Sequence, residues 1–326
     1  MKSNWVFLIG FLAVIFLLAA SSESRAASGQ YYVYLPITVH TGTAWREVGA
    51  GSASGGGISN DPGASEFPSI AIAPDGTPYV AWADVNGEDY EIYVRTWNGS
   101  SWAEAGASSA SGGGISNNAG DSWEPSLVVA PDGTLYVAWI DTSSGELEIY
   151  VRTWDGSSWA AVGAGSASGG GVSNNAGDSL TPSLAIAPNG TPYVFWMDGS
   201  SLDFEVYVRA WDGSSWVEVG AGSASGGGVS NNAGNSSWPS IAVALDGTLY
   251  VAWVDDSSGD REIYVGTWNG SSWADVGAGS AIGGGISNNA GNSEWPSIAI
   301  APDGTPYVAW HDSSDGDYEI YVRRYE

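Results

Sequence analysis

The sequence predicts an all-β protein, a five-bladed β-propeller, from three observations. A unit of 57 residues repeats, each unit contains four short alternating segments, and the partial units at the two ends add up to a whole one. A fixed period of this length is typical of architectures built from repeated supersecondary units. The clearest marker is Pro-Ser followed by Ile or Leu, which recurs every 57 residues at Pro68, Pro125, Pro182, Pro239 and Pro296.

Each repeat reads as four strands joined by hairpins. Asp-Gly-Thr and Asn-Gly or Asp-Gly sequences mark tight turns, and a polar loop separates the second strand from the third. Four short antiparallel strands form one propeller blade. In the first unit the expected strands cover Ser69–Ala73, Tyr79–Trp82, Glu91–Trp97 and Trp102–Ala105.

The two ends of the chain predict how the propeller closes. Trp102 opens the fourth strand of the first unit, and Trp45 lies 57 residues before it. At the other end Tyr325 corresponds to Trp97, so the last unit lacks a fourth strand. We therefore expect Trp45–Val48 to pair with Glu319–Tyr325, so that the N-terminus completes the last blade and no sheet edge stays exposed.

The N-terminal region has the layout of a secretory signal peptide. Lys2 precedes an apolar run, and Ser24-Arg25-Ala26 offers a cleavage site. The expected organisation is a signal peptide at residues 1–26, an apolar segment at 27–41 and the propeller at 42–326. The protein is expected to be secreted, with no membrane span after cleavage. A retained N-terminal anchor is the alternative. The chain has no cysteine, so disulfides cannot stabilise it after export.

The formal charge excludes some partners. It is −27 at pH 7, with 36 acidic and 9 basic residues. Such a surface repels nucleic acid and anionic membranes, although solubility alone would account for most of the carboxylates. We expect a monomer without a nucleic-acid partner.

Most tryptophans are predicted to form the core. They repeat with the period of the blades on the second strand, at the end of the third and at the start of the fourth. Large aromatic side chains contribute much of the buried apolar area of a core. The second-strand set is Trp82, Trp139, Trp196, Trp253 and Trp310.

One face of the propeller differs from blade to blade, and we take it as the candidate binding face. It carries the residues before the repeated proline and the loop between the second and third strands. Exposed aromatic rings beside carboxylates are suited to a sugar, whose ring stacks on an aromatic face while its hydroxyls form hydrogen bonds. Packing of these aromatics between neighbouring loops is the alternative. The candidate ligand-binding residues are Phe67, Tyr90, Trp123, Glu124, Trp238, Glu294, Trp295 and Tyr318.

No cofactor is required by the sequence, but calcium is possible. An aspartate ends the second strand of every repeat, on the same face as Asn- and Asp-rich connections, and oxygen ligands suit a hard cation. The alternative is that the Asn, Asp and Ser side chains bond to their own backbone in turns. The weak calcium candidates are Asp84, Asp141, Asp198, Asp255 and Asp312.

Several segments resemble bacterial sialidase-like proteins with BNR (Asp-box) repeats. The resemblance covers every blade and rests on Ile115–Asn118, Pro125-Ser126, Tyr136–Trp139 and Glu148–Arg152. It implies a propeller and an extracellular carbohydrate context. The Asp-box itself is degenerate, because Trp97 stands where the box has its Asp.

The resemblance does not carry over an active site. Sialidases use three convergent arginines, a Tyr-Glu nucleophile pair and an acidic Asp. Here Arg261 is the arginine expected on the variable face, whereas the others repeat around the ring, where Arg95 and Glu91 share a strand face. His311 is expected to be packed or exposed rather than a general base. The sequence therefore favours a non-catalytic, multivalent module that binds a glycan or a cell-surface polymer. A sialidase-type hydrolase and a structural spacer are the alternatives.

Overall fold

The described part of the chain contains β-strands and no helix. The computed structural model describes residues 44–326 except 86 and 88, so the expected signal peptide and the segment 27–41 lie outside it. In this part no helix is long and apolar enough to cross a membrane. The strands of the first three blades are β1 (Ser65–Ile72), β2 (Pro78–Val85), β3 (Tyr90–Trp97), β4 (Trp102–Glu104), β5 (Ser122–Val129), β6 (Leu135–Asp141), β7 (Glu148–Trp154), β8 (Trp159–Ala161), β9 (Ser179–Ile186), β10 (Pro192–Asp198), β11 (Glu205–Trp211) and β12 (Trp216–Glu218). Those of the last two are β13 (Ser236–Val243), β14 (Leu249–Asp255), β15 (Glu262–Trp268), β16 (Trp273–Asp275), β17 (Ser293–Ile300), β18 (Pro306–Asp312) and β19 (Glu319–Arg324).

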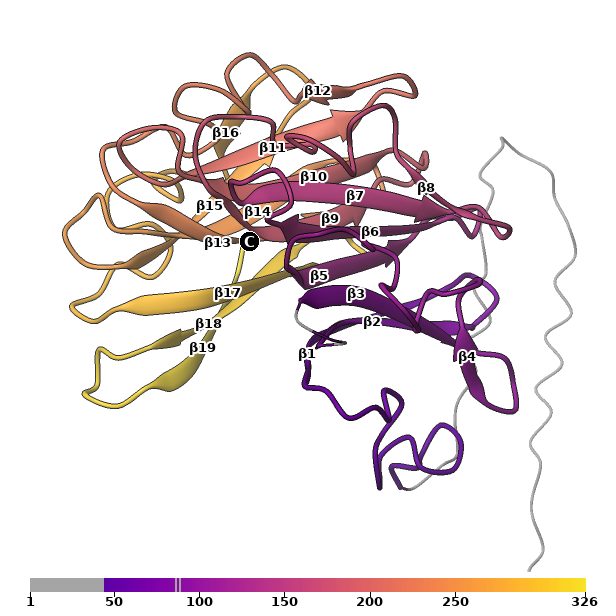
Figure 1. Cartoon of the computed structure of the whole chain (residues 1–326). Helices are drawn as coiled ribbons and strands as arrows, with labels where there is room; N and C mark the ends of the chain where they lie inside the picture. The colour runs from indigo at the N-terminus through magenta and orange to yellow at the C-terminus, as the bar shows by residue number, and fades with distance from the viewer. Residues whose placement is uncertain (1–43, 86, 88) are drawn as a thin grey trace, which may run out of the picture. The chain divides into compact units, whose positions relative to one another are not determined.

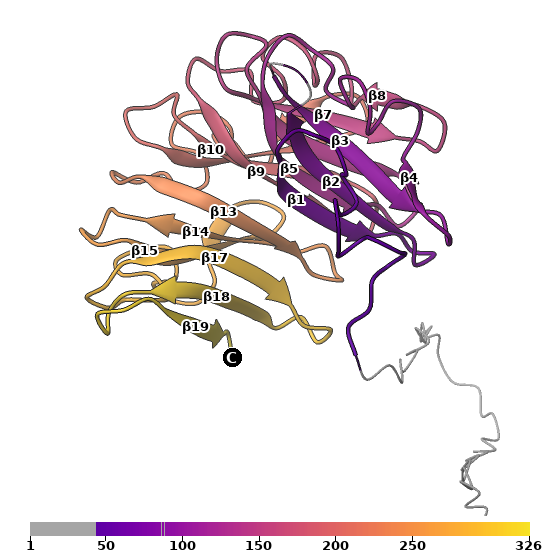
Figure 2. The same ribbon diagram turned by 60° about the horizontal axis from the view of Figure 1, so that its bottom comes forward.

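These strands form five antiparallel sheets, one for each repeat. Within a sheet the strands are paired in chain order, as in β1-β2-β3-β4. The first strands of successive sheets, β1, β5, β9, β13 and β17, lie next to one another on the inside (Figures 1 and 2). The predicted five-bladed β-propeller, with one 57-residue unit for each blade, is confirmed.

Apolar side chains of neighbouring blades pack against each other and form the core. Ile140 and Val151 of the second blade contact Val194 and Trp196 of the third in one buried cluster. The second-strand tryptophans are buried as predicted, and Trp139 also packs edge-on against a tyrosine of β7 with ring centroids 6.0 Å apart. Neighbouring sheets therefore pack through the side chains at alternate positions of their strands, as the period-two pattern of the sequence predicts.

A β-bulge interrupts the first strand of every blade at the residue before the proline. In β1 the pairing register shifts between Glu66 and Ser69, and Phe67 has φ of 53°. A bulky residue with positive φ is strained, and bulges of this kind re-aim a side chain. The same conformation recurs at Glu124, Thr181, Trp238 and Trp295.

A repeated hydrogen bond joins the second, third and fourth blades each to the end of the blade before it. Trp159 donates its indole N–H to the carbonyl of Ala105, at 2.7 Å. Beside it Gly106 has φ of +97°, and a Cβ at this position would lie 2.4 Å from the Trp154 ring. A side chain at Gly106 would therefore displace the ring as well as strain the backbone.

The last sheet has three strands, and the expected closing strand is not formed. The sheet consists of β17, β18 and β19, and Trp45–Val48 has no strand conformation. The carbonyl of Val48 instead accepts a hydrogen bond from the Trp102 indole, at 2.8 Å, and Trp45 is fully exposed. The prediction that this segment completes the last blade is therefore wrong. Val48 contacts the first blade, through the same indole-to-carbonyl hydrogen bond that joins Trp159 to Ala105 one repeat later.

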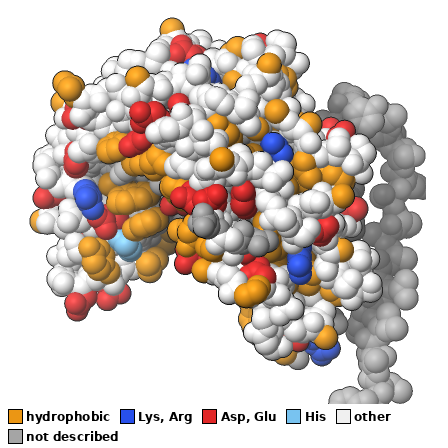
Figure 3. Space-filling model, in the orientation of Figure 1, with side chains coloured by type: hydrophobic (Ala, Val, Ile, Leu, Met, Phe, Trp, Pro, Cys, Tyr) orange, Lys and Arg blue, Asp and Glu red, His pale blue; other side chains and the backbone are white. Residues whose placement is uncertain are grey.

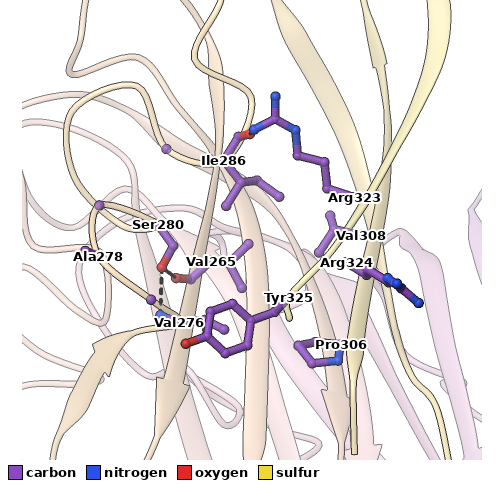
Figure 4. Close-up of a pocket in the computed structure, with 13 residues that line it drawn as sticks. Val265, Val276, Ala278, Ser280, Ile286, Pro306, Val308, Arg323, Arg324 and Tyr325 are labelled. Carbon is purple, nitrogen blue, oxygen red and sulfur yellow. Dashed lines mark hydrogen bonds between the residues drawn. The ribbon is translucent and has the colours of Figure 1, made fainter.

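The last blade has a cavity beside Tyr325 and an exposed apolar face on β19. Beside Tyr325 a cavity of 320 Å³ is lined by residues such as Val276 and Pro306 (Figure 4). Ile320 and Val322 on β19 are exposed, whereas Ile92, at the repeat position of Ile320, is buried against the next blade. The blade-to-blade packing thus stops at β19.

Candidate functional site

The five bulge residues line one shared hollow, which we call the axial hollow. It is bounded by Phe67, Glu124, Thr181, Trp238 and Trp295, together with the prolines that follow them, and has a volume of 460 Å³. Every blade contributes the same backbone position with a different side chain, except that the last two both contribute tryptophan. The strained bulges therefore hold a variable set of side chains around one space.

The two tryptophans form the main aromatic surface of this hollow. Trp238 and Trp295 are stacked, with ring centroids 4.8 Å apart and planes inclined by 23°. Trp295 nevertheless keeps 59% of its surface exposed. One ring thus supports the other, and Trp295 presents a rigid apolar surface to solvent.

A polar cluster joins the last two blades next to this stack. Arg261, after β14 in the fourth blade, forms an ion pair with Glu294 on β17, and its guanidinium lies 5.8 Å from the centre of the Trp238 ring. The other oxygen of Glu294 lies 3.2 Å from His311 Nε2, and His311 contacts Tyr318 with ring centroids 4.6 Å apart. Figure 3 shows hydrophobic side chains gathered beside the pale-blue histidine.

The two carboxylates near the stack have different electrostatic environments. Burial would raise the pKa of Glu294, but hydrogen bonds from Arg261 and His311 bring it below its usual value. Burial raises the pKa of Glu124, and no charged neighbour offsets this effect. The charge of Glu294 is therefore balanced by Arg261, whereas the charge of Glu124 has no opposite charge beside it.

The structure brings together four of the eight candidate ligand-binding residues, namely Phe67, Glu124, Trp238 and Trp295. Glu294 is buried in the adjoining polar cluster, and Tyr318 is largely exposed beside His311.

The remaining two candidates have other surroundings. Trp123 and Tyr90 both pack against the core cluster between the first two blades. Trp123 differs from the later tryptophans because it precedes the bulge by one residue, and adjacent strand residues face opposite ways.

Sequence reasoning gave no role to His311 and did not include Arg261 or Thr181 among the candidates. Aligning the repeats gives a signal for Arg261. Tyr90 and Trp123 occupy the repeat positions of Arg261 and Glu294, and both contribute to an apolar cluster. A charged pair replaces this apolar pair at the junction of the last two blades.

The repeated aspartates at the ends of the second strands are buried acceptors of hydrogen bonds. Asp141 is 0% exposed, and its carboxylate accepts bonds from Asn118 Nδ2, Ser122 Oγ, Trp139 Nε1 and both the amide and hydroxyl of Ser143. Because N–H groups cannot ligate a metal, this donor set does not fit calcium. Among the described residues no three His, Cys, Asp or Glu side chains are grouped as a metal site. Related bonds hold Asp84, Asp198, Asp255 and Asp312.

The first blade departs from this pattern because Asp61 stands where the other blades have asparagine. Asn118 donates to Asp141 at 2.6 Å, whereas Asp61 lies beside Asp84, another carboxylate, and in the described part of the chain Asp84 Oδ1 has no hydrogen-bond donor. Burial and this contact raise the pKa of Asp61. Two adjacent carboxylates repel each other when both are ionised, so the contact depends on pH.

We expect Asp61→Asn to stabilise the protein at neutral pH. A group whose pKa is raised on folding contributes stability at low pH and loses it as the pH rises through the folded value. The asparagine would supply the N–H donor of the other blades, so the free energy of unfolding in urea should rise by about 1 kcal/mol at pH 7.5 and change little at pH 4. The matched variant Asn118→Asp should show the opposite change. Equal unfolding curves at pH 7.5 for all three proteins would contradict this account.

The repeated arginines serve the blade junctions. Arg95 donates to the carbonyl of Ile58, Arg209 to that of Val172 and Arg323 to that of Ile286. Glu91 shares a strand face with Arg95 but forms no ion pair with it, and its carboxyl accepts a hydrogen bond from Ser116. None of these arginines lines the axial hollow.

Comparison with known proteins supports the fold. No protein-family model and no curated protein matches the chain. The chain is similar to a solved protein of unknown function from Dyadobacter fermentans DSM 18053, with 13% identity and a TM-score of 0.51 over 81% of this chain and 79% of that one. It is also similar to an α-L-arabinanase from Penicillium chrysogenum (14% identity, TM-score 0.47, covering 78% and 80%). A Hadza microbial sialidase matches at 12% identity and a TM-score of 0.49, covering 80% and 53%.

Proposed function

We propose that the protein is a secreted binding module that recognises carbohydrate, a free glycan or a cell-surface polymer, through the axial hollow. The observation that carries the proposal is the stacked pair Trp238–Trp295, whose outer ring is exposed at a hollow large enough for a sugar. The C–H face of a pyranose is apolar and packs on the electron-rich face of an indole. Because Trp238 already supports Trp295, the ring loses little freedom when a ligand binds.

Polar groups around the stack supply the hydrogen bonds that hydroxyls need. Glu124 and Thr181 line the same hollow, and the cluster of Arg261, Glu294 and His311 adjoins it. An apolar surface with a few convergent polar groups is the usual composition of a small-molecule site. The proposal includes one binding site on the axis in place of the multivalent binding expected from the repeat.

The arrangement gives less support to a sialidase-type hydrolase. Three of the repeated arginines are bound to backbone carbonyls, and Arg261 is neutralised by Glu294. An anionic sugar would meet Glu124 without a free cation to hold its carboxylate. Recognition of a neutral or cationic saccharide fits these charges better.

Alanine variants of the tryptophans test the proposal on a glycan array. We expect Trp295→Ala and Trp238→Ala to reduce binding at least tenfold, because each removes part of the stacking surface. Trp295→Ala should leave the melting temperature nearly unchanged. Trp123→Ala is the matched control: it removes a tryptophan one position before the bulge and should lower stability while binding persists below the unfolding transition.

A blank array for the unmodified protein, or equal binding by Trp295→Ala, would contradict the proposed function. Repeating the array with a chelator should leave binding unchanged, because the repeated aspartates accept hydrogen bonds from protein groups and do not line the axial hollow.

A further inference from the structure

We propose that the axial hollow selects a saccharide that carries a protonated amine over its neutral counterpart. This inference rests on the proposed function and specifies the ligand class. It follows from the combination of three aromatic rings, Phe67, Trp238 and Trp295, with one carboxylate, Glu124, around a single space. Aromatic faces attract cations through their quadrupole, and an aromatic cage with an acidic group is suited to an organic ammonium ion.

An intramolecular contact shows that one of these rings, that of Trp238, accepts a cation. The Arg261 guanidinium lies 5.8 Å from the centre of the Trp238 ring, within the range of a cation–π interaction. That guanidinium is also paired with Glu294. Arg261 therefore does not compensate Glu124, and the aromatic surface of Trp295 stays available.

Glu124 is the uncompensated charge of the hollow. In the described part of the chain its carboxyl has no ion pair, and burial alone raises its pKa. The sequence has one lysine, Lys2, and no arginine of the described part lines the hollow. A cationic ligand would compensate this carboxylate, whereas a neutral sugar would leave it unpaired.

The surroundings favour the same ligand charge. The chain has a net charge of −27 at pH 7, so the field around it attracts cations. This general attraction raises the association rate of any cation. The local contact with Glu124 is what would discriminate between an amine and its acylated form.

Titration with matched ligands tests the inference. Binding of glucosamine oligomers and of N-acetylglucosamine oligomers of the same length would be measured by calorimetry at pH 6. Choline and its neutral isostere 3,3-dimethylbutanol would serve as minimal probes. We expect the cationic member of each pair to bind about tenfold more tightly. Glu124→Gln should remove this preference, so that the cationic and neutral members of each pair bind with equal affinity.

The control variant is Glu146→Gln, which removes the same charge from an exposed loop of the same blade. It should keep the preference, because Glu146 does not line the hollow. Equal affinity of the unmodified protein for cationic and neutral oligomers would overturn the inference and leave the proposed function standing. A preference that survives in Glu124→Gln would also overturn it. If neither oligomer binds and the array is blank, both proposals fail.

Discussion

Replacing Asp141 by alanine is expected to lower the free energy of unfolding by at least about 3 kcal/mol. The carboxylate is fully buried and accepts hydrogen bonds from Asn118, Ser122, Trp139 and Ser143. Alanine would leave these donors without a partner, and a buried unsatisfied group costs about 1–3 kcal/mol. Urea unfolding followed by tryptophan fluorescence would measure the loss.

Asp132→Ala is the matched control for this prediction. Asp132 is exposed in the turn of the same blade, and its carboxylate accepts a bond from the Thr134 amide at 2.9 Å. Its loss should cost about 1 kcal/mol or less. If Asp141→Ala does not fold, Asp141→Asn, which keeps one acceptor oxygen, should give a measurable intermediate loss. A similar cost for Asp141→Ala and Asp132→Ala would contradict the role of the buried network.

The second large effect expected is a decrease in stability as the pH rises from 5 to 8. Burial raises the pKa of Glu205 to about 7, although Ser230 donates a hydrogen bond to it, and the pKa of Glu91 is raised to about 6 in the same way. A carboxyl whose pKa is raised on folding stabilises the protein below its unfolded value and ceases to do so above its folded value. The free energy of unfolding should therefore fall over the range in which these groups ionise.

Glu205→Gln should reduce this pH dependence. The amide keeps an acceptor for Ser230 and cannot ionise, and one pKa unit corresponds to about 1.4 kcal/mol. We expect the variant to be more stable than the unmodified protein by on the order of 1–2 kcal/mol at pH 8 and similar to it at pH 5. Glu319→Gln, at the same repeat position in the exposed strand β19, should leave the pH profile unchanged. A profile for Glu205→Gln that parallels the unmodified protein would refute the assignment.

The sequence predicted the blades because their signals are local and repeated. Alternation of side chains, the Asp-Gly-Thr turn and the buried second-strand tryptophans such as Trp139 depend on neighbours within one unit. That Trp45–Val48 forms no strand could not be predicted from the 57-residue period. A segment that resembles the fourth strand of the other repeats can form a strand. Whether it reaches the last blade depends on the angles between all successive blades.

The candidate site was predicted only in part, because a bulge changes which residue faces the axis. Trp123 and Trp238 both stand just before the repeated proline, yet they differ by one position relative to it. One packs in the core and the other lines the axial hollow. The pairing of Arg261 with Glu294 joins residues of different blades, and no signal within one repeat indicates it.

The bulge before each proline has a consequence for how this protein could diversify. Because every unit has the same length and the same local backbone, duplicating, deleting or shuffling a unit would move one hollow-lining side chain without disturbing the turns around it. Recombination is favoured between repeats of such similar sequence. It would place a different side chain, such as Phe67, Glu124 or Trp295, at the same bulge position. The ligand preference would thus change with the order of the units, while the residues that form the strands and turns stay the same.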